Sequence, residues 1–309
     1  MKRYSRELTV AIAFSALLVL LAIFAPHFFQ PQPLLARLTA QVPVLVLTIG
    51  MAVVIISRQI DISVGSQFGV CAVVAGLMSA AGAPLGFALL TATLTGTAMG
   101  ALNGFLVAWL GLPSIVVSLA TMVTWAEVLR LFQQGRFINL PPRVQWFGFS
   151  QLVGQASLLF FALGLLGAMA YFLKNRTGGR HFYAVGSDSE AARLAGINPR
   201  GVTMLAFVLM GTLTGIAAFC NMVQSPQVDP KCGVGLEMKA IAAAVVGGVA
   251  VTGGRGGLLG AFFGLLLLAT INPALTYMHV DAYWEKAIQG LVILLAVIAD
   301  GLRTKRSAA

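Results

Sequence analysis

The stretch from Lys174 to Arg200, KNRTGGRHFYAVGSDSEAARLAGINPR, is a polar and basic island between apolar runs that are each long enough to cross a bilayer. Within it, the run Ser-Asp-Ser-Glu from Ser187 to Glu190 has the pattern of a capping box. In such a box the Ser187 side chain caps the Glu190 amide, and the Glu190 side chain reaches back. Gly196 can then end the helix in a left-handed turn. The stretch therefore predicts a helix of about two turns in a loop of a polytopic membrane protein.

This short helix has little to contribute to a membrane-embedded fold, because it lies in a polar loop outside the apolar runs. It is therefore a candidate docking point for another protein. We interpret residues 1–309 as a single transmembrane domain and residues 174–200 as a cytoplasmic loop within it.

The composition excludes a soluble protein. Hydrophobic residues make up 58% of the chain, charged residues only 10%, and the mean hydropathy is +0.89. Soluble domains carry about 25% charged residues. The net charge of +10 would suit nucleic acid, but the basic residues lie at the edges of apolar runs instead of on one face. This distribution indicates membrane topology and argues against a nucleic-acid partner.

The apolar runs predict an all-α fold with about ten transmembrane helices, each span needing about 20 mostly apolar residues. The predicted spans cover residues 8–26, 42–57, 63–82, 85–109, 114–133, 157–173, 201–223, 239–252, 257–278 and 284–300. The first run follows Lys2, Arg3 and Arg6 as a signal peptide would, but no small-x-small cleavage site precedes Pro26. We therefore expect it to be retained as a span.

Basic residues set the orientation. With an even number of spans, most of the 20 lysines and arginines fall in loops on one side, and the opposite loops hold only Arg37, Arg136, Arg143 and Lys231. The positive-inside rule then places both termini in the cytoplasm.

Glycines form two kinds of pattern. Gly96-x3-Gly100-x3-Gly104 and the related spacings at 211/215 and 260/264 predict faces where helix backbones approach closely. Gly247-Gly248 and the glycines of residues 253–257 instead interrupt apolar sequence near the end of a short span. Broken backbone at membrane depth is tolerated only when it is buried or lines a cavity, so a pathway element and a plain structural helix are equally compatible with this run.

Polar side chains inside the predicted spans are the candidates for a substrate pathway, since such groups are costly in lipid. The candidates are Asp61, Gln67, Asn103, Thr121, Asn221, Glu237 and Asn272. Each has a structural alternative. Asp61, or else Ser63, can cap the following helix, and the neutral groups can bond between helices. Glu127 and Arg130 stand at i and i+3, which favours a structural pair.

The sequence lacks the commoner catalytic motifs. It has no Gly-Lys dipeptide and therefore no phosphate-binding P-loop, and it has no HExxH, G-x-S-x-G or S-x-x-K. His27, His181 and His279 show no metal spacing, and the three cysteines form no CxxC pair. We therefore expect no enzyme, no metal site and no cofactor bound by this chain.

Three segments carry a resemblance to a known family. They are residues 59–66 (QIDISVGS, preceded by Gly50), residues 182–197 (FYAVGSDSEAARLAGI) and residues 233–248 (GVGLEMKAIAAAVVGG, continued by GGRG at 253–256). Together they resemble the permease subunit of the ribose/xylose/arabinose-type ABC sugar importers of bacteria, over roughly residues 8–303. Two positions depart from the family: Lys239 stands where many members have an acid, and Leu131 follows Arg130 where a glycine is expected. Met238-Lys239 is similar to the rhamnose or autoinducer-2 branch.

The resemblance implies an inner-membrane permease that imports a monosaccharide such as a pentose, a 6-deoxyhexose or a related sugar. It implies a second permease, a separate ABC ATP-binding subunit that uses ATP and Mg, and a periplasmic sugar-binding protein that meets the loops at 137–149 and 224–235. It makes the short helix a coupling helix for the ATPase, formed by Gly186, Ser187, Asp188, Glu190, Ala191, Ala192, Leu194 and Gly196. A secondary carrier without an ATPase and a membrane-embedded enzyme acting on lipid are the competing hypotheses.

Overall fold

The structure is a computed structural model that describes residues 5–277 and the single helical residues 284, 287, 290, 291 and 294. Its α helices are α1 (Ser5–Phe24), α2 (Pro31–Ala40), α3 (Val42–Ile56), α4 (Val64–Ala80), α5 (Leu85–Ala108), α6 (Ser114–Gln133), α7 (Gln151–Asn175), α8 (Thr177–Ser187), α9 (Ser189–Leu194), α10 (Pro199–Met222), α11 (Leu236–Val246) and α12 (Leu258–Tyr277). Two 3₁₀ helices, η1 (Pro26–Phe29) and η2 (Pro142–Gly148), and two short strands, β1 (Ile138–Asn139) and β2 (Gln227–Val228), complete it.

The all-α polytopic fold is confirmed. Within the described residues, the helices long and apolar enough to cross a membrane are Pro31–Ile56, Leu85–Ala108, Ser114–Gln133, Gln151–Asn175, Pro199–Met222 and Leu258–Leu275. Helices α1 and α4 contain apolar stretches, Leu8–Phe24 and Val64–Ala80, that are shorter. Most of the predicted span 284–300 lies outside the described residues. The total of ten spans and the placement of both termini therefore stay predictions.

The predicted span 239–252 is not a full span. Helix α11 ends at Val246, after 11 residues, so it rises about 16 Å, against the roughly 30 Å of a bilayer core. The physical reason lies in its flanking glycines. Gly235 precedes the helix with φ +84°, and Gly248 follows it with φ +92°, so the chain turns sharply at each end. α11 is therefore a partial helix between two breaks.

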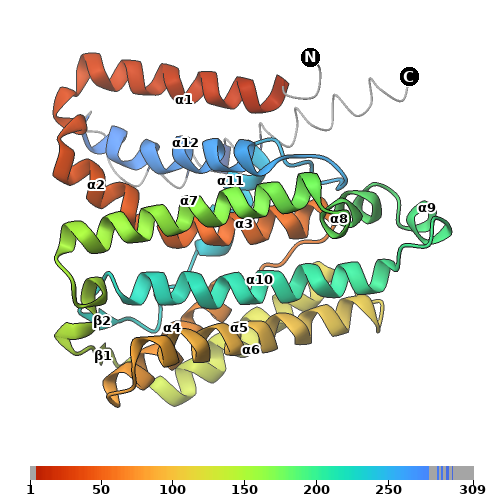
Figure 1. The fold of residues 1–309 in the computed structure, drawn as a ribbon, viewed down its shortest axis with the longest axis horizontal. Coiled ribbons are helices and arrows are strands. Elements are labelled where there is room, and N and C mark those ends of the chain that lie inside the picture. Colours follow the sequence, from red (N-terminus) through yellow and green to blue (C-terminus); the bar gives the residue numbers. More distant parts are fainter. Residues whose placement is uncertain (1–4, 278–283, 285–286, 288–289, 292–293, 295–309) are drawn as a thin grey trace.

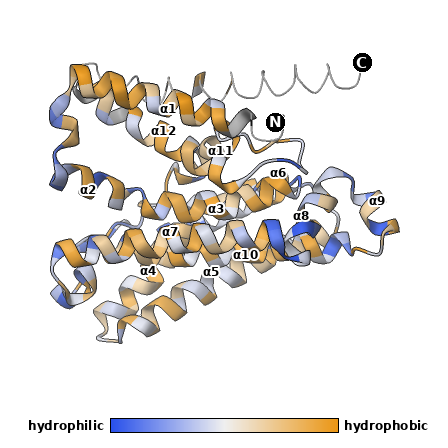
Figure 2. Cartoon of the chain, turned by 45° about the horizontal axis from the view of Figure 1, so that its top comes forward, coloured by the Kyte–Doolittle hydropathy of each residue, from blue (hydrophilic) through white to orange (hydrophobic). Residues whose placement is uncertain are grey.

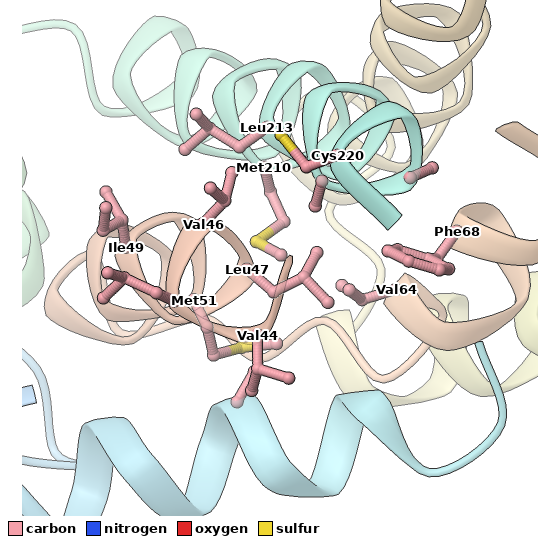
Figure 3. Packing of buried hydrophobic residues seen from close by; sticks show 14 of the residues in the cluster. Val44, Val46, Leu47, Ile49, Met51, Val64, Phe68, Met210, Leu213 and Cys220 are labelled. Carbon is pink, nitrogen blue, oxygen red and sulfur yellow. The ribbon is translucent and has the colours of Figure 1, made fainter. Parts of the chain in front are cut away.

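Helix α3 forms the centre of the bundle. All fifteen of its residues are buried, which is expected of a helix that is hydrophobic all round. Figure 3 shows its side chains between α10, which contributes Met210, Leu213 and Cys220, and α4, which contributes Val64 and Phe68. The predicted span 42–57 is therefore a core helix enclosed by other helices.

Helices α5 and α10 pack along the predicted glycine faces. A Cβ built at Gly96 would lie 3.0 Å from the backbone nitrogen of Gly215, and one at Gly211 would lie 2.9 Å from Gly100 Cα. Neither position has room for a side chain, because the two backbones touch directly. This confirms the prediction of close helix approach.

The bundle has two distinct polar ends, visible in Figures 1 and 2. One end, here called the α9 end, carries α8 and α9. The other, the strand end, carries β1 and β2, which pair antiparallel with Ile138 opposite Val228. The Trp146 amide donates to the Val223 carbonyl at 2.8 Å and ties η2 to the same end. Loops 137–149 and 224–235, far apart in the sequence, thus form one surface.

Candidate functional site: the α9 end and the buried polar cluster

The polar island at 174–200 contains two helices where the sequence predicted one. Helix α8 occupies residues 177–187, and its Phe182, Val185 and Gly186 are buried. The sequence did not predict α8, because Gly178 and Gly179 are residues that disfavour helices. A Cβ at Gly179 would lie 2.6 Å from Leu173 Cα, so the close approach of α8 to α7 requires a glycine there.

The capping of the short helix differs from the prediction by one residue. Ser187 is the last residue of α8, and Asp188 caps α9, with Oδ1 accepting from the Glu190 amide at 2.9 Å and the Ala191 amide at 3.0 Å. Glu190 does not reach back. It accepts a hydrogen bond from Arg193 Nε at 3.1 Å instead, and this interaction raises the pKa of Arg193.

The predicted end of the helix is confirmed. Gly196 has φ +83°, its amide donates to the Arg193 carbonyl, and the Ile197 amide donates to the Ala192 carbonyl. These two bonds are the Schellman arrangement, which satisfies carbonyls that a helix end leaves without partners.

The surface of α9 is exposed apart from one alanine. Ala192 is buried against the bundle, while Ser187, Asp188, Glu190, Ala191 and Gly196 are exposed. Leu194 is 78% exposed. An apolar side chain held on a capped, protruding helix is suited to a pocket on another protein. Most of the residues predicted to couple to an ATPase therefore lie on or beside the projecting α9, whereas Gly186 is buried on α8.

A backbone junction connects α8, the helix that precedes α9, to the transmembrane helices; we call Ile56, Gly186, Gly253 and Gly254 the glycine junction. The Gly254 amide donates to the Ile56 carbonyl at 2.8 Å. A Cβ at Gly186 would lie 2.9 Å from the Ile56 carbonyl carbon and 2.8 Å from the Gly254 nitrogen. The end of α3, the end of α8 and the loop between α11 and α12 thus meet with no side chain between them.

Two further contacts strengthen this junction. The Tyr183 hydroxyl donates to the Gly256 carbonyl at 3.1 Å. Arg58, just after α3, has φ +63°, a left-handed conformation that is uncommon for a residue other than glycine. A Cβ at Gly253 would lie 2.7 Å from Arg58 Cβ. The loop between α11 and α12 therefore contacts both the end of α8 and the first residues after α3.

Three of the predicted pathway residues come together in one buried cluster. Asp61, Gln67 and Asn103 are fully buried, and all three bond Ser63 in the non-helical link between α3 and α4. Ser63 Oγ donates to Asp61 Oδ1 at 2.6 Å and accepts from Gln67 Nε2 at 2.6 Å and Asn103 Nδ2 at 2.8 Å. The Ser63 amide also donates to Asp61 Oδ1, at 3.0 Å, so Asp61 holds the start of α4. We call these four residues the Ser63 cluster.

The other predicted pathway residues lie apart from this cluster. Thr121 is buried on α6 and bonds carbonyls of its own helix, Val117 and Ser118. Asn221 is half-buried near the strand end of α10. The Asn272 side chain is outside what the structure describes. The assignment of all seven residues to a substrate pathway stays a prediction.

Glu237 lies close to the Ser63 cluster. Its carboxyl carbon would be 3.1 Å from a Cβ at Gly65, in the first turn of α4. Lys239, two residues on, instead lines a cavity of about 630 Å³ between α1, α2, α3 and α12. Glu237 thus lies beside α4, whereas Lys239 lies at the cavity. The cavity walls are mostly aliphatic and aromatic, which suits a lipid-like group better than a sugar.

The sequence did not identify Ser63 as the central residue of the Ser63 cluster or Ile56 as a member of the glycine junction. Ser63 was considered only as a helix cap, yet its hydroxyl joins three side chains. Ile56 carried no signal at all, because its role rests on its backbone carbonyl. The spacing of residues 59–66 was the one local pattern that marked this region.

Comparison with known proteins agrees with this architecture. Residues 34–297 match the family model described as branched-chain amino acid transport system / permease component. The chain is 35% identical over 298 residues to the autoinducer 2 import system permease protein LsrC of Salmonella typhi, covering 96% of this chain and 86% of that protein. It is 34% identical over 298 residues to LsrC of Escherichia coli O9:H4, covering 96% and 87%.

No solved structure matches the chain significantly. The family model covers most of the chain, and the two relatives cover nearly all of it, so the resemblance carried by the three sequence segments is confirmed. The chain is therefore a member of the family of permease components of bacterial ABC importers, transport proteins of the inner membrane.

Proposed function

We propose that this chain is the permease subunit of an ATP-binding-cassette importer that carries a monosaccharide or a related sugar-like signal from the periplasm to the cytoplasm. A separate ATP-binding subunit, using ATP and Mg, drives the transport, and a second permease completes the pathway. The α9 end faces the cytoplasm and the strand end faces the periplasm.

One observation carries the proposal: α9 is exposed, and the preceding helix, α8, joins it to the core through the glycine junction. Leu194 is available to a partner, while Gly186 touches the backbone of Ile56 directly. An ATPase that binds α9 differently in its ATP-bound and ATP-free states can shift the permease between two conformations, because only differential affinity moves such an equilibrium.

The strand end supports the second partner. The loops at 137–149 and 224–235 pair through β1 and β2, and Phe137 and Phe149 are 54% and 64% exposed there. Aromatic side chains are enriched at protein interfaces. This surface is the proposed contact for a periplasmic binding protein.

The substrate is inferred from the relatives. Both LsrC proteins are named for import of autoinducer 2, and the Met238-Lys239 pattern is similar to the same branch. We therefore place autoinducer 2 first among the substrates to test, followed by 6-deoxyhexoses and pentoses.

The test is reconstitution in liposomes with the ATPase and the binding protein encoded beside this chain. ATP hydrolysis should rise only when binding protein and one of these sugars are both present. Transport by the purified chain alone, down a gradient and without nucleotide, would instead establish a facilitator.

A further inference from the structure

We propose that the end of α7 binds the headgroup of an anionic phospholipid. Three exposed cations lie there: Lys174 in the last turn of α7, Arg176 directly after that helix, and Arg180 on α8. We call these three residues the basic patch. With the α9 end in the cytoplasm, as proposed above, the lipid belongs to the inner leaflet. The binding itself does not depend on that orientation.

The side chains of the basic patch are held close together. Arg180 Nη2 donates to the Asn175 carbonyl at 3.4 Å, and Asn175 is the residue between Lys174 and Arg176. The guanidinium carbon of Arg176 lies 5.9 Å from the centroid of the Tyr171 ring. Tyr171 precedes Lys174 by three residues, so both lie on the same face of α7. Cations from two helices and the link between them therefore meet at the last turn of α7.

No carboxylate neutralises the basic patch in the part of the chain that the structure describes. The ion pairs found there join Arg130 to Glu127 and Arg193 to Glu190. The sequence also has no Asp or Glu between Glu127 and Asp188. A counter-charge from outside the chain is therefore expected, and clustered cations beside a transmembrane helix attract anionic lipids.

The basic patch continues an exposed apolar face of α7, and Figure 2 shows the apolar length of this helix leading to hydrophilic residues around α8. Spacings of three or four residues place the members of this face on one side of the helix. They are all exposed, and they are Phe160, Gly164, Gly167, Tyr171 and Lys174. Phe160 is 77% exposed, and a Cβ at Gly164 or Gly167 would meet no atom within 4 Å. Within the described residues, this face is therefore open to the acyl chains of the bilayer.

This arrangement fits a phospholipid better than a protein partner. A phospholipid carries its phosphate directly beside its acyl chains, as the basic patch lies directly beside the apolar face. Tyr171 lies between the two, and tyrosine is enriched where a membrane meets water. Arginine also binds phosphate well, because its planar guanidinium can donate two parallel hydrogen bonds. The surface suited to a protein is instead α9, where Leu194 protrudes.

The experiment counts lipids bound to the purified full-length chain in detergent by native mass spectrometry. The probes are dioleoylphosphatidylglycerol and dioleoylphosphatidylcholine, which have the same acyl chains and differ in the charge of the headgroup. We expect phosphatidylglycerol to bind in preference, and this preference to weaken as salt is added, since exposed charges are screened. Glycerol phosphate, a soluble competitor without acyl chains, should not displace the lipid.

The test variant combines Lys174→Gln with Arg180→Gln. It should bind phosphatidylglycerol about 25-fold more weakly, from about fivefold for each cation near the membrane surface. The matched control combines Arg136→Gln with Lys231→Gln, which removes two exposed cations at the strand end. The control should bind phosphatidylglycerol as the wild-type chain does. All four side chains are exposed, so both variants should keep the Tm of the wild-type chain.

Equal binding of the two lipids to the wild-type chain would overturn the proposal, whether or not the variants fold. Wild-type affinity in the test variant would also overturn it. Displacement by glycerol phosphate would identify a soluble anion as the ligand instead. Loss of the lipid when the ATP-binding subunit is added would assign the basic patch to that protein interface. The lipid preference is measured on the chain alone, so its failure is distinct from a failure of the transport proposal.

Discussion

Replacing Gly186 by alanine should disconnect α9 from the transmembrane helices while the chain still inserts in the membrane. The new Cβ would lie 2.8 Å from the Gly254 nitrogen and 2.9 Å from the Ile56 carbonyl carbon, and closer still to the Ile56 oxygen. It would occupy the place of the 2.8 Å hydrogen bond from Gly254 to Ile56. None of these atoms belongs to a flexible side chain, so the backbones must move apart.

The expected cost has two parts. Losing the hydrogen bond costs about 0.5–1.5 kcal/mol, and overpacking a tight contact costs about 1–3 kcal/mol. Together they make about 1.5–4.5 kcal/mol. Since 1.4 kcal/mol is a factor of ten, the equilibrium between coupled and uncoupled arrangements shifts by at least about tenfold. The cost is confined to the contacts of the glycine junction. Transport should therefore fall more than the amount of protein expressed.

The assay is sugar-stimulated ATP hydrolysis by the reconstituted complex, together with the Tm of the purified permease. The matched control is Gly178→Ala on the same helix, where a Cβ would find its nearest neighbour, Phe172 Cζ, at 3.5 Å. Alanine there should be tolerated. If Gly186→Ala and Gly178→Ala give the same stimulation and the same Tm, the argument from the glycine junction is wrong.

Three further substitutions test other parts of the structure. Asp188→Ala should lower the stability of α9 by about 0.5–2 kcal/mol and speed hydrogen exchange at residues 189–194. Ser187→Ala should do neither, because only Asp188 caps the helix. Equal effects of the two substitutions would contradict the observed capping. Leu194→Asp should abolish binding of the ATP-binding subunit in a pull-down without changing the Tm, since its side chain is 78% exposed; a large drop in Tm would show that Leu194 packs in the fold. Gly211→Ala should lower the Tm by separating α5 and α10. Gly164→Ala should leave the Tm unchanged, because a Cβ at Gly164 would have no atom within 4 Å. An equal Tm for both variants would argue against the close packing of the two helices.

Local patterns predicted the elements well where the pattern itself determines the structure. The predicted span 114–133 coincides with α6, and the span 85–109 differs from α5 by one residue. Gly196 was correctly predicted to be left-handed, because only the residue type and its position after the helix matter there.

Features that depend on contacts between distant residues were missed or misplaced. Ser187 and Asp188 are equally good caps by residue type, and the choice between them depends on where α8 ends, which the burial of Phe182 helps to fix. The Ser63 cluster needs α5 to bring Asn103 to a residue forty positions earlier in the chain. No periodicity in a single segment contains that information.

The burial of α3 has a consequence for biogenesis. Pro31–Ile56, which includes α3, is the most apolar of the candidate spans in the described residues, yet it is also the most enclosed by protein. Its hydrophobicity therefore matters most during synthesis, when the segment leaves the translocon before the helices that later surround it have been made. A polar substitution that the finished core could accommodate can still fail at this earlier step. Selection on α3 thus acts twice, first on its partition into lipid and then on its fit among protein side chains.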